Sequence, residues 1–125
     1  MVPDDRKYTQ EHEWVLIEDG VATIGVTDFA AGELGDVVFV ELPEVGSEFS
    51  QGDTVGTIES VKAVADLYLP VSGEIAAINE AVVDSPELVN SDPLEDGWLL
   101  KVKMNDVTEA DQLMDAAAYG QLLEG

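Results

Sequence analysis

The sequence contains no cysteine, and this absence removes several kinds of chemistry at once. Disulfides, thiolate nucleophiles and thiolate metal sites are all excluded. Any redox chemistry must therefore be brought by a group that is added to the chain. The sequence also lacks an apolar run of the roughly 18 to 20 residues that a membrane helix needs, and residues 1–8 are charged where a secretory signal would be apolar. We therefore expect a soluble, cytoplasmic protein.

Basic residues are also scarce: 5 lysines and arginines face 27 acidic residues, and the formal net charge is −22. Such a surface repels nucleic acid and anionic membranes at distances that salt does not screen, so neither is an expected partner. Basic patches on partner proteins would be attracted. Solubility or adaptation to high salt is an alternative cause of the charge. Lysine occurs only at positions 7, 62, 101 and 103, which leaves Lys62 alone in a long lysine-free stretch.

From Trp14 to Val102 the sequence is a series of short apolar runs bounded by Gly, Pro, Asp or Asn. Runs of this kind predict β-strands, for example over residues 14–17, 21–26 and 37–42. Residues 18–20 predict a hairpin turn between the first two strands. With 125 residues the chain has the size of one domain, 1–125, which we expect to be mostly β with short helices.

Helix signals are short and lie between or after these runs. Thr27 and Asp28 can cap a helix that ends at Leu34, with Gly35 as the left-handed residue after it. Ser85 followed by Pro86 predicts a cap and one helical turn at 87–89.

The C-terminal part predicts a helical segment over about 108–124. Thr108 with Asp111 resembles a capping box, Asp115 is a candidate restart for a second short segment, and Gly120 weakens a single unbroken helix. Apolar residues recur at helical spacing and predict a face packed against the sheets: Leu113, Met114, Ala117, Ala118 and Leu122.

An internal similarity suggests two successive β units. Residues 35–40 resemble residues 73–78, and residues 52–55 resemble 91–94, although a pattern this simple can also arise by chance. Each unit would leave an apolar face that only the other can cover. This predicts two small antiparallel sheets packed as a flattened barrel, with Lys62 at the junction of the units.

The segment around Lys62 reads as two β-like arms, residues 57–60 and 63–69, with a hairpin turn at 61–62. Such a turn would hold the lysine ammonium in solvent. Ala63 and Val64 are unusual choices for a bare loop tip, and exposed apolar residues near a lone lysine indicate that something docks there. The alternative is an ordinary surface lysine.

The segments 59–63, 66–68 and 70–74 resemble the lipoylation region of the glycine cleavage H-protein family. The resemblance extends over nearly the whole chain in one order, through residues 8–9, 12–15, 21–28, 34–43, 86–90 and 96–99. It implies a barrel-sandwich hybrid of the biotinyl/lipoyl type with a C-terminal helical segment. It also implies that Lys62 carries lipoic acid in amide linkage, and that Glu59 and Gly73 help lipoylating enzymes to accept this lysine.

The resemblance further implies a carrier that is not itself an enzyme. Lipoyl-Lys62 would accept the aminomethyl group from the pyridoxal-phosphate enzyme glycine decarboxylase and carry it to a tetrahydrofolate-dependent aminomethyltransferase. Dihydrolipoyl dehydrogenase, with FAD and NAD, would then reoxidise it. We expect a monomer. The loaded arm is expected to rest in a cleft lined near Glu13, Val26, Leu34 and Asp66. Residues 29–33 depart from the family pattern, where His or Tyr and then Gln are more usual.

Three alternatives stand beside this interpretation. One is an H-like lipoyl carrier that serves another pathway, such as a lipoate relay or sulfur oxidation. Biotinyl domains and dehydrogenase lipoyl domains share the hairpin, but they typically place methionine beside the lysine or aspartate before it, and Val61 and Ala63 fit neither. The third is an enzyme that uses paired carboxylates or a metal, with His12 and its acidic neighbours as candidate ligands. Adjacent strand residues point to opposite faces and cannot converge on one ion, so we expect no metal.

Overall fold

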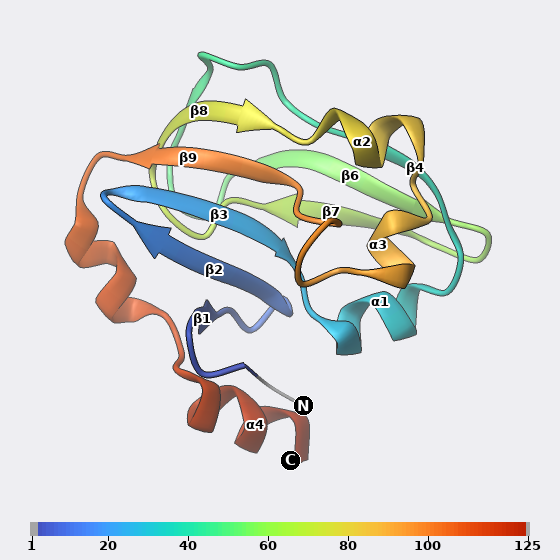
Figure 1. The fold of residues 1–125 in the computed structure, drawn as a ribbon. Coiled ribbons are helices and arrows are strands. Elements are labelled where there is room, and N and C mark those ends of the chain that lie inside the picture. The colour runs from blue at the N-terminus through green and yellow to red at the C-terminus, as the bar shows by residue number, and fades with distance from the viewer. Residues whose placement is uncertain (1–2, 125) are drawn as a thin grey trace.

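The computed structural model describes residues 3–124 and folds them into two antiparallel β-sheets (Figure 1). The larger sheet has six strands in the order β1-β2-β3-β9-β8-β5, and the smaller has three in the order β4-β6-β7. The strands are β1 Lys7–Tyr8, β2 Glu13–Glu18, β3 Val21–Val26, β4 Val37–Glu41, β5 Glu48–Phe49, β6 Thr54–Ser60, β7 Val64–Tyr68, β8 Gly73–Ile78 and β9 Leu100–Met104. The predicted mostly-β fold of two antiparallel sheets is confirmed.

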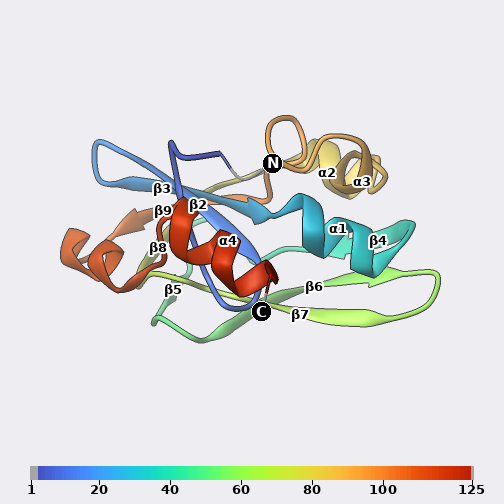
Figure 2. The same cartoon turned by 90° about the horizontal axis from the view of Figure 1, so that it is seen from below.

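Short helices lie at the ends of the sheets. They are α1 Asp28–Leu34, α2 Glu80–Asp84, α3 Leu88–Ser91, the 3-10 helix η1 Val107–Gln112 and α4 Ala116–Glu124. Helix α1 contacts α3, and α2 packs beside β4, so these three gather at one end of the molecule. Helix α4 contacts β1 and lies apart from them (Figures 1 and 2). No helix within residues 3–124 is long and apolar enough to span a membrane.

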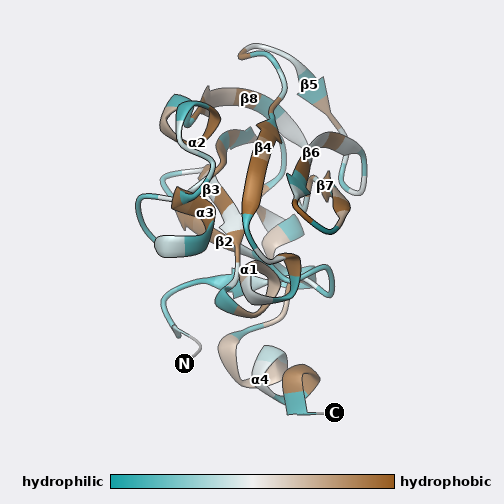
Figure 3. Ribbon diagram, turned by 90° about the vertical axis from the view of Figure 1, so that its right-hand side faces the viewer, coloured by the Kyte–Doolittle hydropathy of each residue, from teal (hydrophilic) through white to brown (hydrophobic). Residues whose placement is uncertain are grey.

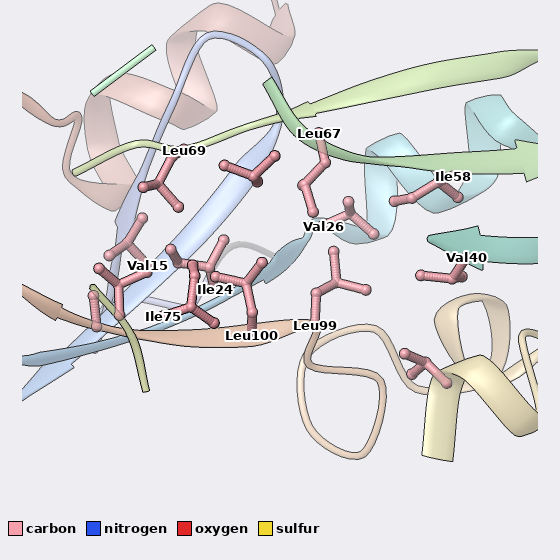
Figure 4. Close-up of a cluster of buried hydrophobic side chains, with 14 of the residues drawn as sticks. Val15, Ile24, Val26, Val40, Ile58, Leu67, Leu69, Ile75, Leu99 and Leu100 are labelled. Atoms are coloured by element: carbon pink, nitrogen blue, oxygen red, sulfur yellow. The ribbon is translucent and has the colours of Figure 1, made fainter. Parts of the chain in front are cut away.

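The main core lies between the two sheets (Figure 4). Ile24, Ile75 and Leu100 come from the six-stranded sheet, and Ile58 and Leu67 face them from β6 and β7. All five are almost completely buried. Each buried side chain of this size stabilises the fold by roughly 1.5–3 kcal/mol. The core therefore anchors β6 and β7 firmly near their middle, while the turn that joins them extends beyond it.

Local signals explain why the elements begin and end where they do. The turn between β2 and β3 uses Asp19 at φ 52° and Gly20 at φ 79°, as a two-residue hairpin turn of the right twist requires. The Thr27 side chain accepts a hydrogen bond from the Ala30 N–H and so caps α1, and Gly35 ends the helix at φ 76°. The predicted helix at residues 28–34 is confirmed, as is the hairpin turn at residues 18–20.

The C-terminal segment is helical and consists of two pieces, η1 and α4, but the predicted cap at Thr108 is wrong. Asp106, not Thr108, caps η1 by accepting the Thr108 N–H. Leu113 is extended, and Met114 exchanges two backbone hydrogen bonds with Tyr8, at 2.8 and 2.9 Å, which interrupts the helix. Asp115 then restarts it as the sequence suggests, because its Oδ1 accepts the Ala118 N–H at 2.8 Å.

The predicted buried face of this last helix is also wrong. Ala117, Ala118 and Leu122 are exposed, and Tyr119 is the buried residue of α4. Its ring stacks on that of Tyr8 with centroids 4.6 Å apart. Together with Trp14 these tyrosines form a second, smaller apolar cluster, on which Leu123 packs.

Two smaller expectations also need correction. Helix α3 begins at Leu88 without a side-chain cap, and Ser85 instead follows the end of α2, a helix that the sequence did not predict. The internal similarity holds only in part. Residues 37–40 and 74–78 are strands of different sheets, but residues 91–94 leave a helix where the repeat demands the start of a strand.

Candidate functional site

Strands β6 and β7 form a long antiparallel hairpin whose last paired residues are Glu59 and Val64. Ser60 closes the turn between them. Its backbone N–H donates to the Ala63 carbonyl at 2.8 Å, and its Oγ accepts the N–H groups of Lys62 and Ala63 at 3.3 and 3.1 Å. Ser60 therefore satisfies the N–H groups of Lys62 and Ala63, and the exposed side chain of Lys62 stands at the tip.

Apolar side chains surround this tip and remain open to solvent. Val61 and Val64 are 68% and 65% exposed. The pairing of β4, β6 and β7 places Phe39, Glu59 and Val64 directly side by side across the three strands. Paired residues share a face of the sheet, so Glu59 lies between two exposed apolar residues. Figure 3, which views the molecule from this side, shows the hydrophobic run of β4.

A cavity of about 210 Å³ opens where β2, β3 and α1 meet β6 and β7. All four residues that the sequence analysis assigned to a cleft line it: Glu13, Val26, Leu34 and Asp66. Sequence reasoning did not anticipate the other lining residues, which are Glu11, His12, Phe29, Ala30, Glu33, Ile58, Ala65 and Leu67. The walls are mainly apolar, as an aliphatic chain would need.

Glu13 is the unusual group in this cavity, because it is only 3% exposed. Its Oε2 accepts the backbone N–H of Tyr68 at 3.0 Å, and the Thr9 hydroxyl donates to its Oε1 at 3.4 Å. Burial is the main cause that raises the pKa of Glu13 to about 8; the nearby charge of Glu11 acts in the same direction, and the two hydrogen bonds oppose the shift. Near neutral pH the carboxyl therefore holds its proton for most of the time. The carboxylate expected from the sequence is present only as a minority form.

A second, larger hollow of about 410 Å³ adjoins the 210 Å³ cavity. Glu11 and Glu13 line both hollows. The larger one is also lined by Gln51, Tyr68 and Met114. Glu11 and Glu13 thus form the wall that the two hollows share.

The residues 29–33, which depart from the family pattern, form one wall of the 210 Å³ cavity. Phe29 packs its ring against His12, with centroids 4.6 Å apart. His12 has a left-handed backbone at φ 65°, and its Nδ1 lies 2.8 Å from the Tyr119 hydroxyl. Helix α4 therefore supports this wall through Tyr119. Within residues 3–124 no group of three His, Asp or Glu side chains is arranged to hold a metal ion.

Glu59 and Gly73 are not brought together by the fold. Glu59 is exposed three residues before Lys62, whereas Gly73 is buried at the start of β8 in the other sheet. A Cβ at Gly73 would collide with the carbonyl oxygen of Lys103 and lie 2.7 Å from Cγ1 of Val102. Close approach of β8 and β9 explains this glycine. Gly73 lies outside the β6–β7 hairpin, so it does not shape the arms of that hairpin.

Two packed antiparallel sheets, a lysine at the tip of an exposed hairpin and an adjoining apolar cavity are the architecture of the biotinyl- and lipoyl-type carrier domains. The family model described as Glycine cleavage H-protein matches residues 6–125. The glycine cleavage system H protein of Carboxydothermus hydrogenoformans is 51% identical over 124 residues, covering 99% of this chain and 95% of that protein. The same-named protein of Staphylococcus saprophyticus is 51% identical over 122 residues, covering 98% and 97%.

A solved structure agrees with these sequence relatives. The crystal structure of a glycine cleavage system H protein from Mycobacterium marinum superposes with a TM-score of 0.92 at 40% identity, covering 99% of this chain and 100% of that one. The chain belongs to the glycine cleavage H-protein family.

Proposed function

We propose that this chain is the lipoyl carrier of a glycine cleavage system, with lipoic acid attached in amide linkage to Lys62. The observation that carries the proposal is the position of Lys62 at the tip of the β6–β7 hairpin, in a turn that Ser60 braces by accepting the N–H groups of Lys62 and Ala63. An enzyme can reach this ammonium without unfolding any strand. Family membership supports the choice of lipoic acid, and the resemblance around residues 59–63 supports the choice of lysine.

The residues of the cavity fit the arm that such a modification would create. Val26, Leu34 and Leu67 offer apolar walls to an aliphatic chain, and Glu13 offers one acidic group at the wall. When bound, lipoic acid would supply a disulfide that takes up the aminomethyl group of glycine and a dithiol that is later reoxidised. The protein contributes reach, orientation and exclusion of water. We propose no catalytic residue in this chain.

Glu13 has a specific part in this proposal. A protonated amine in the cavity would favour the ionised form of the buried carboxyl, and the pair would be held by a charge-assisted hydrogen bond. Three exposed acidic residues that also line the cavity add negative charge: Glu11, Glu33 and Asp66. The apolar walls would keep water from the labile cargo.

The cleft is tested by loading the lipoylated protein and measuring spontaneous formaldehyde release in the parent and in Glu13→Gln. Faster release from the variant is expected. Equal rates would show that Glu13 does not protect the cargo.

The partners follow from the same cycle. We propose that the carrier domain, residues 1–125, acts as a monomer. It would visit glycine decarboxylase, the tetrahydrofolate-dependent aminomethyltransferase and dihydrolipoyl dehydrogenase in turn, after lipoylating enzymes have modified it. The exposed apolar residues Phe39, Val61 and Val64 are the proposed contact surface around the lysine. Glu59 lies among them, and we propose that the lipoylating enzymes recognise its side chain. We propose that they also recognise the close packing of β8 on β9 that Gly73 permits.

Intact-mass measurement and peptide mapping test the attachment directly. After incubation with a lipoate ligase, a single lipoyl addition on the peptide that contains Lys62 is expected. Reconstitution with glycine decarboxylase, aminomethyltransferase and dihydrolipoyl dehydrogenase then tests the pathway. A protein that is lipoylated on Lys62 but does not support glycine cleavage would instead point to an H-like carrier for a lipoate relay or for sulfur oxidation.

A further inference from the structure

The tip of the β6–β7 hairpin is tied to the loop that follows α1. The Val61 N–H donates to the Asp36 carbonyl at 3.0 Å, and Val37 is the register partner of Ser60. The turn that presents Lys62 therefore rests on residues 35–37. The position of this loop determines what lies beneath the lysine side chain.

Asn90, in α3, holds residues 35–37 in place through both the nitrogen and the oxygen of its side-chain amide. Its Nδ2 donates to the Gly35 carbonyl at 2.7 Å, and its Oδ1 accepts the Val37 N–H at 2.8 Å. The two contacts join segments 55 and 53 residues apart in sequence. A side chain that both donates and accepts is needed to satisfy a carbonyl and an N–H two residues apart. Asparagine meets this need, whereas aspartate provides only the acceptor.

Gly35 provides the surface on which the lysine stem lies. Its backbone, at φ 76° and ψ −158°, falls in a region that is essentially restricted to glycine. A Cβ added there would be 3.3 Å from Cε and 3.8 Å from Cδ of Lys62. The aliphatic stem of Lys62 thus passes over a residue without a side chain. The preceding residue, Leu34, lines the 210 Å³ cavity.

We infer that Asn90 and Gly35 form a seat for the Lys62 stem, and that this seat directs an attached arm past Leu34 toward the cavity instead of into solvent. Asn90 is a positioning residue, because it acts on Lys62 only through the loop at residues 35–37. The part of the inference that concerns the arm rests on the proposed lipoylation of Lys62. The part that concerns the lysine stem does not, and it can be measured in the unmodified protein.

The chain offers a matched control for Asn90. Asn79 is a buried asparagine whose Nδ2 donates to the carbonyls of Asp96 and Trp98 at 2.8 and 2.7 Å, and whose Oδ1 accepts the Ala81 N–H. Its side chain makes three hydrogen bonds where that of Asn90 makes two, and none of the three reaches the loop under Lys62. Asn79→Ala therefore reproduces the loss of stability without disturbing the seat.

The first experiment measures NMR relaxation of the Lys62 side-chain carbons in the unmodified protein, with exposed Lys103 as reference. In Asn90→Ala the order parameter of Lys62 Cε is expected to fall to that of Lys103, whereas in Asn79→Ala it stays at the parent value. Asn90→Asp keeps the Val37 contact and is expected to fall between. If Asn90→Ala leaves Lys62 Cε unchanged, or if Asn79→Ala loosens it equally, the seat is refuted.

The second experiment uses the lipoylated protein and measures spontaneous formaldehyde release after loading. Asn90→Ala is expected to release formaldehyde at least roughly fivefold faster than the parent, because it removes two hydrogen bonds and one net hydrogen bond is worth a factor of about five. Asn79→Ala is expected to match the parent. If Lys62 loosens but release does not change, the seat does not direct the arm and the inference fails. Absence of lipoate from Lys62 would contradict the proposed function, while the NMR result would still decide the seat.

Discussion

Replacement of Glu13 by glutamine isolates the energetic cost of the buried carboxyl. Glutamine has nearly the same shape and keeps a carbonyl oxygen for the Tyr68 N–H, but it has no charge to bury. Every other acidic residue is common to the two proteins. The difference in unfolding free energy between Glu13→Gln and the parent therefore reports the ionisation of this one group.

The sign of the effect follows from the two pKa values of Glu13. In the unfolded chain the carboxyl titrates near its ordinary value of 4.5, whereas in the folded protein its pKa is about 8. The folded state binds the proton more tightly between these values, so this group's contribution to stability is greatest below pH 4.5 and is lost as the pH rises to about 8. At 1.36 kcal/mol per pKa unit, the cost is roughly 3 kcal/mol at pH 7 and roughly 5 kcal/mol above pH 8.

Urea unfolding at pH 5, 7 and 9 measures this difference. Parent and Glu13→Gln should be close in stability at pH 5, and the variant should gain roughly 3 kcal/mol over the parent at pH 7 and more at pH 9. Glu59→Gln, which removes an exposed carboxylate outside the cavity, is the control and should show no comparable gain. A difference between Glu13→Gln and the parent that stays constant from pH 5 to pH 9 would refute the reasoning from burial.

Three further predictions concern the lysine, the charge and Gly73. Lys62→Arg should keep the fold and the positive charge but take up no lipoate, and peptide mapping that found lipoate on Lys7, Lys101 or Lys103 would contradict the assignment. Molar salt should raise the melting temperature, because it screens the repulsion between acidic side chains. Among residues 3–124 only one acidic side chain, that of Asp5, is within ion-pair distance of a basic one, that of Arg6. A melting temperature that does not change with salt would argue against destabilising charge repulsion in the folded protein. Gly73→Ala should cost about 1–3 kcal/mol in urea unfolding of the unmodified protein, because β8 and β9 must separate. If its stability matches the parent but its lipoylation slows, Gly73 acts in recognition and not in packing.

Much of the sheet could be predicted from the sequence, because its signals are local. Alternating apolar residues, the turn at Asp19 and Gly20 and the Thr27 cap each act within a few residues of themselves. Asp115 locally indicates a restart of the C-terminal helix, but the cause of the break before it could not be predicted in the same way. It depends on the pairing of Met114 with Tyr8, a contact between the two ends of the chain that no local pattern records.

The almost complete burial of Glu13 could not be predicted for a related reason. When only one face of a sheet is buried, the residues directly before and after a buried strand residue point to solvent. A glutamate directly before Trp14 would therefore be expected to be solvent-exposed. Here Glu13, Trp14 and Val15 are all buried. The main core covers Val15, and the second cluster of Tyr8 and Tyr119 covers Trp14. Strand β2 is thus covered on both faces, and the rule of alternation fails at its first residue.

The cavity residues could be named from the family resemblance, but the seat under Lys62 could not. Gly35 reads as an ordinary helix-ending glycine, and Asn90 as a polar residue of a short helix. Their joint role depends on a loop and a helix that meet only in the folded chain. Hydrogen bonds between such distant segments leave no periodicity in the sequence, and only the three-dimensional arrangement reveals them.

A buried glutamate that costs the empty protein roughly 3 kcal/mol at pH 7 is an unusual feature for a domain whose total stability is of the order of 5–15 kcal/mol. Strongly shifted groups of this kind concentrate at functional sites, because a ligand can recover the energy that the empty site loses. A cationic amine beside Glu13 would do so by stabilising the ionised carboxyl, and below pH 8 its entry would release the proton that Glu13 holds. The same burial that weakens the empty carrier would therefore strengthen its hold on a cationic load, and a neutral load would gain nothing from it.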